Sequence, residues 1–246
     1  MPRFYAPQPR IVDGILTIEG EEAKHIRKVL RLRPGDDVLI FDGSSKEYEG
    51  TIIKEKASSV LIRIREIHPS QNESPIRITL AQSLLKGEKM DYLIQKSTEL
   101  GVKGIVPFFS SRSVPLLMEK SRSTARHRRW EKIAIEASKQ CGRGVLPQIM
   151  PLMTYSEMLK NVPPNSVRLL FWEREGEHLK EVLEQSDRNT EIFFIVGPEG
   201  GLSQEEVDAG KREDFIPVNL GRRILRSETA AVCLLGILQY ELGDMG

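Results

Sequence analysis

Arginines gather near the C-terminus, where a predicted strand gives way to a predicted helix. Arg222, Arg223 and Arg226 follow the apolar stretch 215–219, and the helix is expected to begin near Ser227. A helix N-terminus presents backbone N–H groups to anions, and a guanidinium adds charge-assisted hydrogen bonds to a phosphate or a developing oxyanion. The alternative is charge decoration of a surface loop, but the helix dipole disfavours cations at this end. We therefore interpret these arginines as a binding or catalytic feature.

A glycine-rich loop precedes this segment in the chain. Residues 197–202 follow a predicted strand at 192–196 and include three glycines. Such a loop lets a ligand approach the backbone closely, and in open α/β sheets ligands bind beyond the carboxyl ends of the strands. An ordinary tight turn is the alternative, because Ser203 and Glu206 form a capping-box pattern that starts a helix directly afterwards.

Several common catalytic signatures are missing from the sequence. No predicted strand is followed by a glycine-rich turn ending in Lys-Ser or Lys-Thr, which excludes a P-loop enzyme. The nearest match to a dinucleotide fingerprint, at 142–144, has Pro147 where the third glycine belongs. The four histidines lie far apart in the sequence and the two cysteines are not neighbours, so no metal site is expected.

The composition is that of a nearly neutral globular protein with local basic clusters. The 246 residues include 39% hydrophobic residues, enough for a large core, and carry a formal net charge of +1. Residues 23–33 contain five basic side chains and no acid, and arginines at 122, 126, 128 and 129 precede Trp130. Both clusters suit the backbone of a nucleic acid, and the alternative is two solvated helix faces. Two such clusters on a neutral chain favour a nucleic-acid partner.

A cytoplasmic location is expected. The longest apolar stretch, residues 230–238, is about half of the roughly 18 residues that a membrane span needs. Residues 1–7 lack the apolar core of a secretory signal. Cys141 and Cys233 allow at most one disulfide, which is typical of a reducing compartment.

The polar stretch 68–75, which contains Pro69 and Pro75, suits neither helix nor strand and predicts a domain boundary. Before it, short strands at 37–41, 48–53 and 60–64 predict a small β domain over residues 1–72, which we expect to be barrel-like. After it, the α/β domain spans residues 73–246. Its predicted strands, at 76–81, 104–109, 167–172, 192–196 and 215–219, alternate with predicted helices, at 86–100, 122–140, from 203 onward and at 227–242. This alternation predicts a mostly parallel sheet covered by helices.

Several strings of the sequence are similar, in order and spacing, to those of one family. They are PRFY at 2–5, VLRLRPGD at 29–36, FDG at 41–43, KGEKMD at 86–91, QKSTELGV at 95–102, EASKQCGR at 136–143, GPEGG at 197–201 and LGRRILRSETA at 220–230. Together they span almost the whole chain. On these strings the chain resembles the 16S ribosomal RNA (uracil-N3)-methyltransferases.

The resemblance implies an N-terminal PUA-like β barrel for RNA and a C-terminal SPOUT-type α/β domain with a deep trefoil knot. It also implies S-adenosylmethionine as methyl donor, S-adenosylhomocysteine as product, 16S rRNA in the small ribosomal subunit as substrate, and a homodimer, with no metal and no membrane. Carried onto matching positions, the cofactor-binding residues are Phe171, Glu173, Gly197, Pro198, Glu199, Gly200, Leu220, Gly221, Ile224, Leu225 and Arg226. The residues expected to contact RNA are Arg3, Lys24, Arg27, Lys28, Arg31, Arg33, Lys86 and Arg143.

The implied reaction requires a cation and a base. Methylation of uracil N3 requires a weakly acidic proton to leave while negative charge spreads onto the two flanking carbonyl oxygens. We expect Arg226 to stabilise that oxyanion. We expect Glu228, or as an alternative Glu199, to accept the proton, provided that burial makes the carboxylate basic enough. The other interpretation of Glu228 is a first-turn carboxylate that only complements the helix dipole.

Two other functions stay open on the sequence alone. The first is a non-catalytic RNA-binding dimer, which would bind RNA in a salt-sensitive way but have no affinity for the cofactor. The second is a SPOUT methyltransferase acting on another RNA site, which would share the cofactor loops and differ in product.

Overall fold

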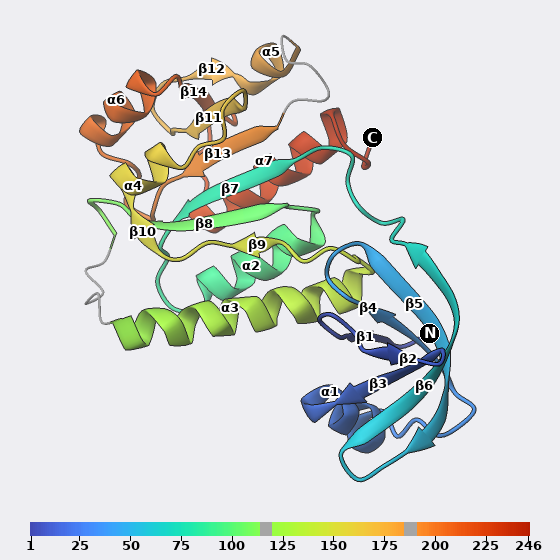
Figure 1. Ribbon diagram of the computed structural model, residues 1–246. Helices are drawn as coiled ribbons and strands as arrows, with labels where there is room; N and C mark the ends of the chain where they lie inside the picture. Colours follow the sequence, from blue (N-terminus) through green and yellow to red (C-terminus); the bar gives the residue numbers. More distant parts are fainter. Residues whose placement is uncertain (114–119, 185–190) are drawn as a thin grey trace. The chain divides into compact units, whose positions relative to one another are not determined.

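The computed structural model of the chain, shown in Figure 1, describes residues 1–113, 120–184 and 191–246. The chain divides into two compact units. The N-terminal unit comprises Met1–Glu73 and Ser138–Leu146, and the C-terminal unit comprises Ser74–Ala137 and Pro147–Gly246. The expected boundary after residue 72 differs from this division chiefly in the short segment 138–146, which the sequence analysis counted with the α/β domain.

The N-terminal unit is built on a six-stranded sheet in the order β1-β4-β5-β6-β3-β2. Neighbouring strands are antiparallel except β1 and β4, which are parallel. A short helix, α1 (Gly20–Lys24), runs into a π-helix over His25–Val29, and the two carry most of the first basic cluster. The strands are β1 (Arg3–Tyr5), β2 (Ile11–Val12), β3 (Ile15–Glu19), β4 (Asp37–Phe41), β5 (Lys46–Glu55) and β6 (Ser59–Pro69).

Glu73 holds the segment 138–146 in the N-terminal unit. Its Oε1 accepts hydrogen bonds from the backbone N–H groups of Gly144 and Val145, at 3.0 and 2.9 Å. Its Oε2 accepts two from the guanidinium of Arg143, at 3.0 and 3.1 Å. Arg3 in turn donates to the carbonyl oxygen of Arg143 at 3.1 Å and pairs with Glu47 at 2.8 Å. The sequence pattern could not indicate this arrangement, because it depends on side chains that lie far apart along the chain.

Arg3 and Arg143, which were expected to contact RNA, are largely buried. Only 6% of the Arg143 side chain and 15% of the Arg3 side chain are exposed, and both guanidinium groups are paired with carboxylates. A charge that leaves water must be paired to avoid a large desolvation cost. Both arginines therefore serve the interior of the N-terminal unit.

The C-terminal unit contains an eight-stranded sheet in which every pair is parallel, as the alternating pattern predicts. The strand order is β10-β8-β7-β13-β11-β14-β12, with β9 also paired to β8. Figure 1 shows the central strands lying side by side. The strands are β7 (Ile78–Ser83), β8 (Gly104–Phe109), β9 (Gln148–Ile149), β10 (Met153–Thr154), β11 (Val167–Phe171), β12 (Glu177–His178), β13 (Ile192–Val196) and β14 (Ile216–Asn219).

Helices cover both faces of this sheet, since successive strand residues are buried on alternate sides. Leu80 and Phe194 belong to one core, with side chains of α2, α3, α5 and α7, whereas Ala81 and Phe193 belong to the other, with side chains of α4 and α6. Capping boxes start α4 and α6, the second at Ser203 as predicted. The helices are α2 (Lys89–Glu99), α3 (Lys120–Cys141), α4 (Tyr155–Lys160), α5 (Leu179–Glu184), α6 (Gln204–Arg212) and α7 (Ser227–Glu241).

The strand order does not determine how the chain threads between β11 and α7, so the trefoil knot stays a prediction. In the described parts of the chain, no helix combines the length and the apolar composition that crossing a membrane requires.

Replacement of Arg143 by Met should lower the free energy of unfolding by roughly 2–3 kcal/mol, because the carboxylate of Glu73 loses its charged partner. The measurement is urea denaturation followed by circular dichroism. Lys28→Met is the control, since Lys28 is exposed and its replacement should change stability by less than about 0.5 kcal/mol. Equal stabilities of the two variants would contradict the structural role of Arg143.

Candidate functional site

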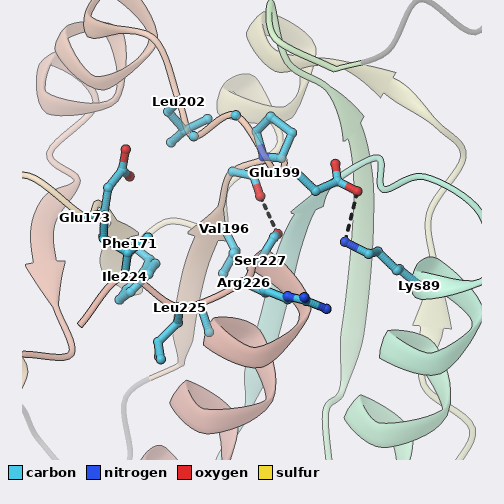
Figure 2. A pocket seen from close by; sticks show the side chains of 15 residues that line it. Lys89, Phe171, Glu173, Val196, Glu199, Leu202, Ile224, Leu225, Arg226 and Ser227 are labelled. Atoms are coloured by element: carbon cyan, nitrogen blue, oxygen red, sulfur yellow. Dashed lines mark hydrogen bonds and ion pairs between the residues drawn. The ribbon is translucent and has the colours of Figure 1, made fainter.

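The loops at the carboxyl ends of three adjacent strands surround a cavity. The strands β13, β11 and β14 are neighbours in the sheet, so the segments that follow them meet at one edge, where α7 also begins. The cavity has a volume of about 630 Å³, and Figure 2 shows the side chains around it. It is lined by Lys89, Phe171, Glu173, Val196, Gly197, Pro198, Glu199, Gly200, Gly201, Leu202, Ile224, Leu225, Arg226, Ser227 and Ala230.

Two glycines allow the loop after β13 to close on its neighbours. Gly201 has a φ of +69°, and a Cβ atom there would lie 2.7 Å from a carboxylate oxygen of Glu173. A Cβ atom on Gly197 would lie 2.9 Å from Cγ of Leu202. Both distances are shorter than van der Waals contact, so a larger residue would push the loop out of the cavity wall.

Gln82, at the end of β7, joins this loop to the start of α7. Its side chain is fully buried, and its Nε2 donates to the hydroxyl of Ser227 at 3.0 Å and to the carbonyl oxygen of Ser83 at 2.9 Å. The same amide lies 3.4 Å from the carbonyl oxygen of Gly197. The Ser227 hydroxyl also donates to that oxygen, at 2.5 Å. Two walls of the cavity are thus fixed to the central strand through one amide and one hydroxyl.

Charged side chains gather at one end of the cavity. The ammonium of Lys89 lies 3.4 Å from a carboxylate oxygen of Glu199 and 3.4 Å from one of Glu228. Partial burial acts to raise the pKa of Glu199, but hydrogen bonds from its own N–H and that of Lys86, with the Lys89 ammonium, hold the pKa below its usual value. Glu199 therefore stays ionised and is a poor proton acceptor.

Glu228 has one oxygen that no described residue satisfies. Its Oε1 faces Lys89, whereas its Oε2 is buried and has no hydrogen-bond partner among the described residues. Only 12% of the side chain is exposed. A buried carboxylate oxygen without a donor is costly, so this atom is available to a donor on a ligand.

Arg226 stands next to this group and caps α7 without a side-chain capping hydrogen bond. Its side chain is exposed, and no ion pair joins it to a carboxylate in the described ranges. In Figure 2 it extends toward the side of Lys89, whereas Phe171, Ile224 and Leu225 lie on the opposite side. The cavity therefore has one end where apolar side chains lie with the Glu173 carboxylate, and a charged end where Lys89, Glu199 and Arg226 lie.

Family models match most of the chain. The model of an RNA methyltransferase domain matches residues 72–239, and that of an RNA methyltransferase PUA domain matches residues 18–65. The ribosomal RNA small subunit methyltransferase E of Bacillus subtilis is 33% identical over 233 residues, which cover 92% of this chain and 90% of that protein. The protein of the same name from Buchnera aphidicola subsp. Acyrthosiphon pisum is 32% identical, and the match covers 99% of this chain and 95% of that protein.

A solved structure of a protein with the same name is also similar to this chain. The ribosomal RNA small subunit methyltransferase E of Neisseria gonorrhoeae, crystallised with S-adenosylmethionine, superposes with a TM-score of 0.91 at 34% identity, covering 100% of both chains. The chain belongs to the small-subunit ribosomal RNA methyltransferase E family. This membership confirms the resemblance drawn from the sequence strings, including a PUA domain at the N-terminus.

Most residues that the family resemblance assigns to the cofactor line the cavity. The exceptions are Leu220, which packs against the core, and Gly221, whose N–H donates to Asn219 at 3.2 Å. The cavity also includes Gly201 and Leu202, within the predicted loop, and four residues to which the sequence pattern assigned no place in the site: Lys89, Val196, Ser227 and Ala230. Lys89 precedes the apolar spacing of α2, so helical periodicity gave no signal for it.

The basic residues expected to contact RNA lie in different settings. Five of them, Lys24, Arg27, Lys28, Arg31 and Arg33, follow one another along α1, the π-helix and the next loop, around the exposed apolar pair Val29 and Leu30. Arg27 and Arg33 both pair with Glu55, at 3.4 and 3.5 Å. Lys86 is exposed in the C-terminal unit, and its N–H donates to Glu199.

In the second cluster, Arg129 pairs with Asp91, and the side chain of Arg122 lies outside the described residues. The described residues contain no group of three or more His, Cys, Asp or Glu side chains that could hold a metal ion.

Removal of the Ser227 hydroxyl should loosen the loop after β13. We expect Ser227→Ala to reduce stability by about 1–2 kcal/mol, because a buried hydroxyl between Gln82 and Gly197 is lost. Hydrogen–deuterium exchange of the amides at 199–202 should become faster. Ser97→Ala is the control, since its buried hydroxyl lies on α2 and has no hydrogen-bond partner among the described residues. Unchanged exchange in Ser227→Ala would refute the anchoring role.

Proposed function

We propose that this protein transfers a methyl group from S-adenosylmethionine to N3 of one uridine of 16S rRNA in the small ribosomal subunit. The observation that carries the proposal is the charged end of the cavity. There an arginine without an ion pair to any described carboxylate stands beside a carboxylate with a buried, unsatisfied oxygen. Membership of the small-subunit ribosomal RNA methyltransferase E family supports the RNA and the methyl donor.

The cavity residues fit S-adenosylmethionine. The volume of about 630 Å³ falls within the roughly 300–1,000 Å³ typical of small-molecule sites. Phe171, Leu225 and Ala230 would hold the flat adenine, and backbone groups of the loop 197–201 would bind its polar edge. The Glu173 carboxylate would attract the ammonium of the methionine portion. S-adenosylmethionine supplies an electrophilic methyl group carried on a sulfonium and becomes S-adenosylhomocysteine.

Two side chains would act on the uracil. Arg226 would donate hydrogen bonds to a uracil carbonyl oxygen, where negative charge develops as the N3 proton leaves. Oε2 of Glu228 would accept that proton, because it is the carboxylate oxygen that no described residue satisfies. Glu199 is the weaker candidate for the base, since its pKa is lowered and its Oε1 already accepts from Lys86 and Lys89.

The target base must reach this end of the cavity unpaired. A uracil inside an RNA helix hides N3 in its base pair, so the site must receive an exposed or flipped nucleotide. The basic residues along α1 and the π-helix, with exposed Val29 and Leu30 between them, would bind the neighbouring RNA through phosphates and apolar contacts. A ribosomal RNA substrate would also accord with the cytoplasmic location expected from the sequence.

We also infer a homodimer that forms through α7. Cys233, Ile237 and Tyr240 are exposed and recur at helical spacing, so they form one stripe along this helix. Tyr240, in the last turn of this largely apolar helix, is 63% exposed, so the stripe ends in a large exposed aromatic side chain. A second copy is the occupant that the family resemblance implies.

The proposed reaction is tested by incubating the protein with S-adenosylmethionine labelled in the methyl group and small ribosomal subunits that lack the modification. After digestion of the RNA, label is expected in 3-methyluridine at one site. Label in another nucleoside would support a methyltransferase with a different target. Binding of RNA without any labelled product would instead support the non-catalytic RNA-binding dimer.

Arg226→Ala should reduce kcat by at least about 100-fold, as loss of one preorganised donor to a developing oxyanion does. The variant should unfold at the wild-type urea concentration, because Arg226 has no side-chain capping bond. Arg212→Ala, an exposed arginine at the end of α6, is the matched control and should retain activity. Near-normal turnover of Arg226→Ala would remove this residue from the mechanism.

Tyr240→Asp should halve the molar mass in light scattering, since a charge at the C-terminal end of the α7 stripe opposes its burial against a second copy. Ile11→Asp, which adds the same charge at an exposed apolar position of the N-terminal unit, should leave the mass unchanged. A wild-type protein that is already monomeric at micromolar concentration would contradict the dimer.

A further inference from the structure

Lys89 occupies a position that neither the cofactor nor the uracil explains. It is the first residue of α2, where the helix dipole disfavours a cation. Its ammonium lies between two carboxylates from different segments, Glu199 of the loop after β13 and Glu228 of α7, at 3.4 Å from each. In Figure 2 a dashed line joins Lys89 to Glu199. The two carboxylates therefore compete for one cation.

We propose that Lys89 is a positioning residue that keeps Glu228 ionised for proton transfer, and that Glu199 sets how strongly it does so. The inference rests on the proposed function, because it assigns Glu228 the proton of uracil N3. Lys89 acts through Glu228 and needs no contact with the substrate.

Few charged groups near Glu228 could stabilise its ionised form. β7 and β13 pack against α7, and neither Ile78–Ser83 nor Ile192–Val196 contains a titratable side chain. The charged side chain that α2 directs at Glu228 is Lys89. The loop after β13 contributes Glu199, which contacts the same Lys89 ammonium. Arg226 lies two residues earlier in the chain, and its exposed side chain is assigned to the substrate oxyanion. Lys89 is therefore the cation paired with a carboxylate that is largely removed from water.

The arrangement meets two requirements of a general base, because Glu228 must be ionised before the reaction and must still accept a proton during it. Before transfer, one ammonium serves two carboxylates. The N3 proton then moves to Oε2 of Glu228, and the electron pair left on N3 forms a bond to the methyl group, whose bond to the donor sulfonium breaks and leaves its electron pair on sulfur. Once Glu228 is neutral, the ammonium is left with Glu199 alone, which is fixed by the N–H of Lys86 at 3.2 Å. The attraction between Lys89 and ionised Glu228 opposes protonation, and Glu199 lessens that opposition because it shares the ammonium with Glu228.

The test is the pH dependence of kcat/KM for formation of 3-methyluridine, whose acid limb reports protonation of the base in the free enzyme. Lys89→Met removes the cation, so Glu228 is protonated more easily and the acid limb should move to higher pH by about one unit or more. Glu199→Gln removes the competing anion, so the limb should move to lower pH. Two variants of neighbouring residues thus shift the profile in opposite directions.

Lys96→Met is the matched control. Lys96 lies on the same helix, has the same 34% side-chain exposure as Lys89 and pairs with Glu99 at 2.8 Å, but it does not line the cavity. Its profile should coincide with that of the wild type. Lys89→Arg, which retains the charge, should restore most of the wild-type limb.

A fall in activity of Lys89→Met that is equal at every pH would reduce Lys89 to a structural role and overturn the inference. If Lys89→Met does not fold, the pH profile of Glu199→Gln decides alone. An acid limb that stays at the wild-type pH or moves to higher pH overturns the inference. A wild-type protein that forms no 3-methyluridine would contradict the proposed function itself, which separates that failure from failure of the role of Lys89.

Discussion

The buried amide of Gln82 is the constraint on which the geometry of the site depends. A donor that is fully removed from water must be hydrogen-bonded, and here its partners belong to the start of α7 and to the loop after β13. The charged groups are attached to these two segments. Glu199 lies two residues beyond Gly197, and Arg226 and Glu228 flank Ser227. The separation of these three charges is therefore determined by the central strand and not by the flexible side chains themselves.

In the proposed function, division of the cavity into two ends separates binding from chemistry. Contacts at the end around Phe171 would be available to the cofactor before and during the reaction, so they would contribute affinity more than rate. In the proposed reaction, the hydrogen bonds of Arg226 would strengthen as the N3 proton leaves, whereas the ion pair of Lys89 with Glu228 would weaken. The charged end would combine a cation for the developing oxyanion, a carboxylate for the proton and an ammonium that stabilises the ionised carboxylate, within the first turns of two helices that pack together.

The sequence allowed the parallel sheet, the long helices and two of the three cavity loops to be recognised from local patterns. Strands such as Ile192–Val196 are apolar throughout because both faces are covered, and the Ser203 capping box marks the start of α6.

The remaining features depend on long-range pairing. Gln82 and Lys89 show no local signal, since their partners are more than a hundred residues away in the chain. Arg143 was assigned to RNA because its partner Glu73 is also distant in the chain. In the structure its guanidinium donates to the Glu73 carboxylate within the N-terminal unit. The shortest strands, β1, β2, β9, β10 and β12, were too brief for periodicity to detect.

The most direct test of the account is a crystal structure of the protein with S-adenosylhomocysteine and a short single-stranded RNA containing one uridine. We expect the adenine against Phe171 and Leu225, a uracil carbonyl oxygen within hydrogen-bonding distance of the Arg226 guanidinium, and uracil N3 within about 3 Å of Oε2 of Glu228. A uracil bound in this cavity with N3 directed away from Glu228, or a cofactor bound elsewhere, would contradict the central claim that these loops form one site for cofactor and base.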